Sequence, residues 1–261
     1  MKSSQTLQTA IETLIERAAN SIDGGEAMKL AQAALNLAHV ASLELRVPPT
    51  ENIKETMSSP VTLPREQIVE ALDWRNDWLL KAHKHQIEPT GYWWSIWLIC
   101  ADRACGKTRA AAETLAWWAW EEPNTRWLVS APNSEAVSKS FKGLLAVIPL
   151  VLVQKYNSSW HELTLTNGSV IQGISATEPE RFRNERFHGG WIEELSAQEY
   201  LQGAWDMIHP CMRLGQDFKL IASTTPKHKS EVLALLNRDD VAVSTARNSM
   251  QPEGIAPNTD R

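Results

Sequence analysis

The stretch Ile96–Arg109, I-W-L-I-C-A-D-R-A-C-G-K-T-R, decides the expected fold. The apolar run Ile96–Ala101 predicts a buried strand, and the alanine-rich run Arg109–Trp120 predicts a helix. A strand, a tight loop, Gly-Lys-Thr and a helix occur in this order in a phosphate-binding loop, where free backbone N–H groups at the helix start receive an anion. In such a loop Lys107 contacts the β- and γ-phosphates, and the Thr108 hydroxyl binds Mg²⁺.

The loop departs from the full motif G-x-x-x-x-G-K-[ST]. Ala101 stands where the first glycine belongs, and Gly106 is the one glycine retained, with Ala104 and Cys105 before it. A left-handed backbone at an alanine would be strained, because Cβ disfavours positive φ. A Gly-Lys-Thr triplet also occurs by chance, so these residues alone leave both interpretations open.

Composition bounds the classes of protein to consider. The 261 residues, 43% hydrophobic and 22% charged, are typical of one large globular domain, or one domain with an appendage. A net charge of −5 excludes DNA wrapping through a general positive field, so any DNA contact must be local or shared across subunits. The three cysteines lack paired spacing, which indicates a reducing compartment. We expect neither a signal peptide nor a membrane span.

The chain carries 12 tryptophans, a high number. We expect those near the loop to pack the sheet with large apolar faces, and base stacking is the alternative. They are Trp93, Trp94, Trp97, Trp117, Trp118, Trp120 and Trp127.

The chain divides into four parts. Residues 1–46 contain no Trp, Pro, Cys, Phe or Tyr, and their apolar spacing predicts a helical hairpin. A partner-binding module is one interpretation of this hairpin, and plain hairpin packing is the other. Residues 47–62 predict a linker, residues 63–249 the main domain, and residues 250–261 a tail.

Alternating patterns within residues 63–249 predict an α/β domain with a mainly parallel sheet. Asn167-Gly168 predicts a β-hairpin inserted into this sheet. The expected helices are Leu63–Lys84, Arg109–Trp120, Ser134–Ala146, Ala197–Arg213 and one that ends at Leu235. The expected strands are Ile96–Ala101, Arg126–Ala131, Trp160–Thr166, Ser169–Ile174, Phe187–Glu194, Phe218–Ser223 and Val241–Ala246.

Two acids, Glu193 and Glu194, end one expected strand. In a nucleotide-hydrolysing sheet one such acid approaches Mg²⁺, here Glu193, and the next orients and deprotonates the attacking water, here Glu194. Both acids also suit the start of a following helix, where they offset its dipole. Spacing alone does not separate the two interpretations.

Thr224 and Thr225 follow another expected strand, where hydroxyl groups can sense a γ-phosphate. An ordinary strand-to-turn exit is the simpler interpretation of this pair in isolation. Arg103, in the loop, is a candidate arginine finger in cis, and Arg181 and Arg183 are candidates to act on a neighbouring subunit's nucleotide. A surface role is the alternative for each arginine.

Several further segments follow one another along the chain, each occurring once. They are Q-I-E-P-T-G-Y-W-W-S-I-W-L-I, R-A-C-G-K-T-R-A-A-A-E, W-L-V-S-A-P-N, G-L-L-A-V-I-P, L-T-N-G-S-V-I-Q-G-I-S-A-T-E-P-E-R-F-R, G-G-W-I-E-E-L, M-R-L-G and S-T-T-P-K. Together they resemble the ATPase domain of tailed-bacteriophage terminase large subunits, the DNA-packaging motors. The resemblance covers about Gln86 to Ser249.

The resemblance implies a P-loop NTPase fold of the ASCE type that uses ATP and Mg²⁺. It implies that Glu194, Lys107 and Arg103 act in catalysis, that Thr108 and Glu193 hold the metal, and that Thr224 and Thr225 couple hydrolysis to DNA movement. The nucleotide-binding residues it implies are Gln86, which contacts adenine, with Arg103, Ala104, Cys105, Gly106, Lys107 and Thr108. The implied partners are double-stranded DNA, the portal, the small terminase subunit and further copies in a ring, in the bacterial host cytoplasm.

The sequence departs from the family pattern at several places. Ala101, Asp102 and Ala104 replace usual loop glycines, Glu193 replaces an aspartate, and Asn184 replaces a glycine. The residues after the main domain are too few for the family's nuclease, so no DNA cutting is expected. The sequence therefore predicts a packaging ATPase that translocates double-stranded DNA. The alternatives are a degenerate domain that binds nucleotide or partners without efficient hydrolysis, and a helicase-like ATPase.

Overall fold

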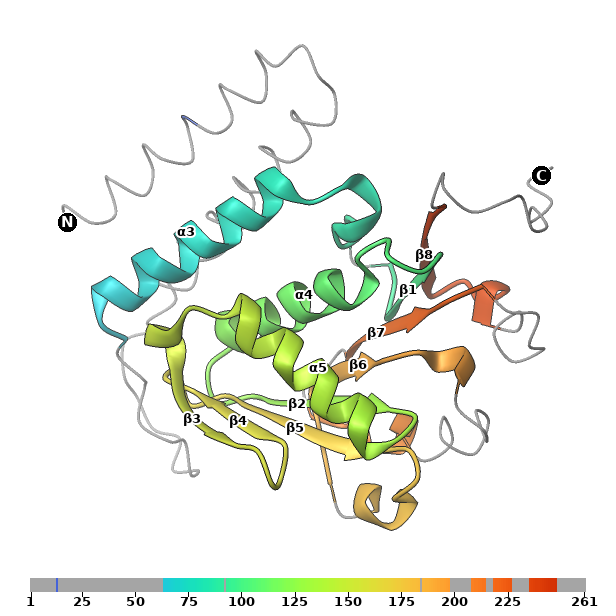
Figure 1. Cartoon of the computed structure of the whole chain (residues 1–261). Coiled ribbons are helices and arrows are strands. Elements are labelled where there is room, and N and C mark those ends of the chain that lie inside the picture. Colours follow the sequence, from blue (N-terminus) through green and yellow to red (C-terminus); the bar gives the residue numbers. More distant parts are fainter. Residues whose placement is uncertain are drawn as a thin grey trace, which may run out of the picture.

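The structure is a computed structural model that describes Thr13 and residues 63–91, 93–183, 185–197, 208–214, 218–226 and 235–247. Apart from Thr13, the predicted hairpin at 1–46, the linker at 47–62 and the tail at 250–261 lie outside the described residues, as does Asn184. In the part that is described, eight strands form one sheet, and helices α3, α4 and α5 lie along it (Figure 1).

The elements have the following bounds. The strands are β1 (Ile96–Ala101), β2 (Arg126–Ala131), β3 (Val153–Asn157), β4 (Glu162–Leu165), β5 (Val170–Ser175), β6 (Gly189–Ile192), β7 (Lys219–Thr224) and β8 (Val241–Ala246). The α-helices are α3 (Arg65–Lys81), α4 (Lys107–Glu121) and α5 (Ser134–Val147), and the 3₁₀ helices are η1 (Lys84–Gln86), η2 (Leu150–Leu152), η3 (Pro179–Phe182), η4 (Leu195–Ala197) and η5 (His209–Cys211).

The strand order is β3-β4-β5-β2-β6-β7-β1-β8. The six strands from β5 to β8 in this order pair in parallel. Strand β4 pairs antiparallel with β5 in the hairpin that turns at Asn167-Gly168, and β3 adds antiparallel to β4 at the edge. The predicted α/β fold, with a mainly parallel sheet and an inserted hairpin, is confirmed. The sequence analysis missed β3, whose residues V-Q-K-Y-N are half-buried or exposed and carry no apolar run.

Alternation along the strands divides the core into two layers. In β1, Trp97 and Ile99 face a cluster with α3, α4 and α5, whereas Ile96 and Leu98 face the opposite cluster. Figure 1 shows α3, α4 and α5 on the same side of the sheet. A strand buried on both faces explains why β1 reads as a continuous apolar run.

The tryptophans near the loop mostly belong to this core. Six of the seven, all except Trp93, are 0–7% exposed. The rings of Trp118 and Trp127 lie 5.7 Å apart, centroid to centroid. The prediction of sheet packing is wrong for Trp93, which precedes β1 and is 57% exposed.

The predicted helix bounds fail at two places. We expected a helix over Leu63–Lys84, but α3 ends at Lys81 because Ala82 has an extended backbone, with ψ at 142°. We also expected a helix over Ala197–Arg213. Its described residues instead include 3₁₀ turns in η4 and η5, and Met212 forms a bridge with Phe187. A backbone that pairs with a strand cannot also continue a helix.

None of the helices described is long and apolar enough to cross a membrane.

The hairpin turn at Asn167 also ends α4. The buried Asn167 side chain donates through Nδ2 to the carbonyl oxygens of Ala119 and Trp120, both at 2.8 Å, and its Oδ1 accepts from the Ser169 N–H at 3.0 Å. Carbonyls in the last turn of a helix have no partner inside the helix. The turn therefore supplies partners to α4 and joins the helix to the inserted hairpin.

We expect Asn167→Ala to lower the free energy of unfolding by about 2–3 kcal/mol, because three buried polar groups lose their partners. Asn157→Ala is the control, since the Asn157 side chain accepts from the N–H groups of Ser159 and Trp160 in its own exposed turn. Urea denaturation measures both variants. Equal losses would show that Asn167 does not join α4 to the hairpin.

Glu121, the last residue of α4, gives folding a pH dependence. The pKa of Glu121 is raised from 4.5 to about 7, mainly by burial and also by nearby Glu88, while Arg75 and Lys219 oppose the shift. The folded state therefore keeps a proton that the unfolded state loses between pH 4.5 and 7, so stability falls as pH rises through this window. We expect Glu121→Gln to remove up to about 3 kcal/mol of this decline. Melting curves at pH 5 and 8 measure it, and an unchanged slope would contradict it.

Candidate active site

Three neighbouring parallel strands, β6, β7 and β1, end at the same edge of the sheet (Figure 1). Strand β1 leads through residues 102–106 into α4, β6 leads into Glu193 and Glu194, and β7 ends at Thr224, directly before Thr225. The carboxyl ends of parallel strands lie together, so three segments that are distant in sequence converge.

The loop between β1 and α4 uses a left-handed backbone twice. Gly106, at the start of α4, has φ at 76°, and Ala104 has φ at 66°. Cβ makes this conformation unfavourable by roughly 1 kcal/mol at an alanine. The strain expected from the missing glycines is therefore present at Ala104. Ala101, by contrast, is the last residue of β1 and pairs with Ala246, so its lack of a glycine causes no strain.

The Lys107 side chain folds back over this loop. Its Nζ donates to the carbonyl oxygens of Ala101 at 2.9 Å and Asp102 at 3.1 Å, and to Thr225 Oγ1 at 3.3 Å. It also lies 4.0 Å from Glu194 Oε1. The side chain is 7% exposed, and three oxygen acceptors match the three N–H donors of an ammonium group.

Glu193 lies directly against Thr108. The Thr108 hydroxyl donates to Glu193 Oε1 at 2.6 Å, while Trp191 Nε1 donates to Oε2 at 3.1 Å and Ser223 Oγ also donates to Oε2. Burial raises the pKa of Glu193, and the hydrogen bonds from Ser223 and Thr108 oppose that shift. The two residues expected to hold a metal thus place their oxygens side by side. Sequence reasoning missed Ser223, which could have been found as a buried polar residue before Thr224-Thr225.

Glu194 follows in a strained conformation, with φ at 46°. Its carboxylate is 35% exposed and lies beside Lys107. Thr225 Oγ1 lies 3.1 and 3.3 Å from the two carboxylate oxygens. The Glu194 N–H donates to Ser223 Oγ at 3.3 Å. The backbone turn directs this carboxylate away from Glu193 and toward Lys107.

The two threonines differ in position. Thr225 contacts both Lys107 and Glu194, whereas Thr224 is fully buried and accepts from the Ser196 N–H at 3.2 Å. Ser196 Oγ also donates to the Thr225 carbonyl at 3.3 Å. The end of β7 is thereby tied to η4, the turn that follows the acidic pair.

A hollow of about 490 Å³ opens above these groups. Its lining comprises Arg103, Ala104, residues 106–109, Glu194 and, from α5, Gly143, Ala146 and Val147. The α5 wall was missed from sequence. The small residues of this wall could have indicated it, because they leave space beside the start of α4. Asp102 is not among the described residues that line this hollow.

Gln86, predicted to contact adenine, lies behind the loop. It is 7% exposed, its Nε2 donates to the Cys105 carbonyl at 3.2 Å, and its Oε1 accepts from the His83 N–H at 2.9 Å. His85 Nε2, to which sequence reasoning gave no role, lies 2.8 Å from the same Cys105 oxygen. A Cβ at Gly106 would lie 2.1 Å from Gln86 Nε2. Gln86 therefore packs against the loop, and its contact with adenine stays a prediction.

The candidate arginines fall into two places. Arg103 is exposed and lines the hollow. Arg181 and Arg183 lie at η3, outside the lining of the hollow, and form ion pairs with Glu178 at 2.7 Å and Glu180 at 3.1 Å. Of the three arginines, Arg103 alone lines the hollow.

Comparison with known protein families identifies the family to which the chain belongs. Residues 98–244, more than half of the chain, match the family described as Terminase large subunit, T4likevirus-type, N-terminal. The chain belongs to this family. The resemblance and the ASCE P-loop fold class predicted from sequence are confirmed.

Solved terminase structures share the fold. The large terminase ATPase domain of Thermus phage P74-26 has a TM-score of 0.55 and 15% identity, over 63% of this chain and 80% of that one. The large terminase of another thermophilic bacteriophage has 0.51 and 13%, over 67% and 44%, and that of bacteriophage HK97 has 0.51 and 15%, over 76% and 42%. This terminase-family chain thus spans under half of either large terminase. No curated protein matches its sequence.

We expect Ala104→Gly to raise the free energy of unfolding of this terminase domain by about 0.5–1 kcal/mol, because glycine removes the left-handed strain in the loop. Ala136→Gly, at helical φ and ψ in α5, should lower it by a similar amount. Chemical denaturation of both variants measures the difference. Destabilisation by both would show that Ala104 is not strained.

Proposed function

We propose that this chain is a Mg²⁺-dependent ATPase that drives translocation of double-stranded viral DNA. One observation carries the proposal: Lys107, Thr108 and Glu194, from two separate segments, line one hollow large enough for a nucleotide, and Glu193 contacts Thr108 beside it. Membership of the terminase family supports DNA packaging as the process that uses the ATP.

The phosphates bind at the amino end of α4. The backbone N–H groups there have no partners within the helix, and the positive end of the dipole favours an anion. Residues Ala104, Cys105 and Gly106 form the loop that surrounds the phosphates, and Lys107 exchanges its carbonyl contacts for the β- and γ-phosphates. Arg103, exposed at the rim, reaches the γ-phosphate in cis. Gln86 contacts the adenine, which requires it to leave its present bonds.

Thr108 and Glu193 fit a magnesium site. Their hydroxyl and carboxylate oxygens lie 2.6 Å apart, and oxygen is the ligand type that Mg²⁺ prefers. When bound, Mg²⁺ neutralises charge on the β- and γ-phosphate oxygens. Trp191 and Ser223 hold the Glu193 carboxylate in place for this contact.

Glu194 orients the attacking water and accepts its proton. Its carboxylate is partly exposed at the hollow, and Thr225 and Lys107 limit its orientation. A water held there attacks the γ-phosphorus, the bond to the β-phosphate oxygen breaks, and ADP and inorganic phosphate leave.

The remaining predicted roles concern movement and assembly. Thr224 and Thr225 couple hydrolysis to movement of η4 and β7, to which they are bonded. Arg181 and Arg183, outside the chain's own hollow, act on the nucleotide of a neighbouring copy in a homo-oligomeric ring. The portal and the small terminase subunit complete the assembly, in the host cytoplasm.

A second candidate function is nucleotide or partner binding without efficient hydrolysis. Two observations favour it: Ala104 is strained, and the Glu193 carboxylate already accepts from three donors that a metal would have to compete with or join. This candidate keeps the fold and the hollow but loses turnover.

Phosphate release with and without duplex DNA tests both functions. We expect Lys107→Ala and Glu194→Gln to lower the ATP turnover of the wild type about 100-fold or more, because a charge contact and a general base are lost. Glu70→Gln, on the exposed side of α3, is the matched control and should keep the wild-type rate. Stimulation by DNA is expected for a translocating motor.

The two functions separate in the wild type. Equal background rates in wild type, Lys107→Ala and Glu194→Gln would overturn the ATPase. If ATP then raises the melting temperature of the wild type but not of Lys107→Ala, the binding function holds in its place.

A further inference from the structure

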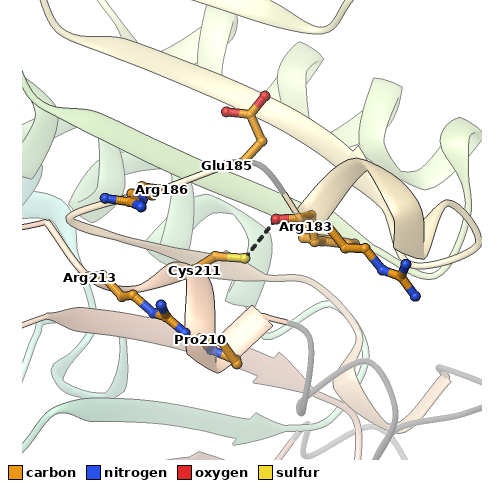
Figure 2. Close-up of a pocket in the computed structure, with 7 residues that line it drawn as sticks. Arg183, Glu185, Arg186, Pro210, Cys211 and Arg213 are labelled. Carbon is orange, nitrogen blue, oxygen red and sulfur yellow. Dashed lines mark hydrogen bonds between the residues drawn. The ribbon is translucent and has the colours of Figure 1, made fainter.

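A second hollow, of about 300 Å³, lies beside the start of β6 (Figure 2). It forms where the segment before β6 meets η5, and there Phe187 and Met212 make a parallel bridge. Six residues of nearly extended chain, roughly 20 Å, separate Phe187 from Glu193 at the other end of β6. A ligand in this hollow is therefore not the nucleotide bound at the chain's own loop.

The bridge fixes the direction of two arginines. Phe187 and Met212 point into the core, where they are 0% and 7% exposed. Successive side chains of an extended backbone point to opposite faces. Arg186, before Phe187, and Arg213, after Met212, therefore point away from the core, and both are exposed and line the hollow.

Among the described residues that line the hollow, Glu185 is the one carboxylate, and it is already paired. Glu185 Oε2 accepts from Arg126 at 2.6 Å, and its Oε1 accepts from Gln172 at 3.3 Å. In the part of the chain that the structure describes, no carboxylate lies within 4 Å of the guanidinium groups of Arg186 or Arg213. These two arginines therefore form a local positive charge on a chain whose net charge is −5.

The other lining groups do not cancel this charge. Burial raises the pKa of Cys211, against the effect of Arg213, so the thiol stays neutral, and its Sγ donates to the Phe182 carbonyl at 3.0 Å. Arg183 pairs with Glu180, and Figure 2 shows its side chain extending away from Arg186 and Arg213.

We propose that Arg186 and Arg213 form a phosphate-binding site separate from the ATP hollow. A guanidinium presents two parallel N–H donors that match two oxygens of a phosphate, and it stays charged at all physiological pH values. Two such groups, with no carboxylate within 4 Å among the described residues, suit a polyanion. This phosphate has two possible sources. One is the backbone of duplex DNA, and the other is the polyphosphate of a nucleotide, either free or bound to another copy of the chain.

The first arm of the test measures binding of a short duplex to the full chain without nucleotide. Arg186→Gln/Arg213→Gln is compared with Arg65→Gln/Lys155→Gln, which removes the same two charges at exposed positions elsewhere. With DNA as the source, the first pair weakens binding at least about tenfold at low salt and reduces the slope of log K against log salt by about 2. The control pair changes neither by as much.

The second arm titrates inorganic pyrophosphate into the Lys107→Ala chain, whose own phosphate loop is impaired. With a nucleotide as the source, adding Arg186→Gln/Arg213→Gln weakens pyrophosphate binding about tenfold or more, and adding the control pair leaves it intact. Arg186→Lys/Arg213→Lys keeps the charge but removes the paired donors, so it should recover only part of the loss and serves if the glutamine pair does not fold.

The outcome of the two arms decides the proposal. A change in either arm beyond the control supports the site and identifies its source. If the arginine pair and the control pair behave alike in both arms, no phosphate site exists there. Neither arm measures ATP hydrolysis, so a failure here is distinct from a failure of the ATPase.

Discussion

The parallel pairing of β6, β7 and β1 is the constraint on which the site depends. Their backbone hydrogen bonds bring the end of β1, the acidic pair after β6 and the threonines of β7 to one edge. A slip of one residue in a strand would exchange its two faces. In β6 such a slip would turn Trp191, which holds Glu193, to the other layer of the core.

The charged groups at this edge of the sheet are one lysine, Lys107, and two glutamates, Glu193 and Glu194. Among the described residues, Lys107 is the buried cation beside these two carboxylates, and its Nζ lies 4.0 Å from Glu194 Oε1. Glu193 instead relies on neutral donors, Thr108, Trp191 and Ser223, so burial keeps its pKa raised. Glu193 and the partly exposed Glu194 lie around one lysine, which leaves a partial deficit of positive charge. Under the proposed function a divalent cation makes up that deficit.

The sequence predicted those parts of the fold that depend on local signals. The strands Ile96–Ala101 and Arg126–Ala131 carry apolar runs that end at turn residues, so their bounds were predicted without error. Strand β6, at Gly189–Ile192, is shorter than the expected Phe187–Glu194. Edge strand β3 has no such run, and its pairing with β4 depends on contacts that a single sequence does not reveal. At the site, the sequence motifs singled out Lys107, Thr108, Glu193 and Glu194, which the fold brings together. The placement of Gln86 behind the loop and the α5 wall were not predicted, because both depend on packing between elements.

Thr225 shows how events at the loop can reach the rest of the sheet. Its hydroxyl accepts from Lys107 and lies in contact with the Glu194 carboxylate, so it joins the Lys107 ammonium group to the acid. If Lys107 turns toward a phosphate, Thr225 loses that donor and remains bonded to Glu194 alone. Its carbonyl meanwhile stays tied to Ser196 in η4, so the acid and the turn after it respond together. Under the proposed function, these bonds carry a change at the Lys107 ammonium group to the segment that follows β6.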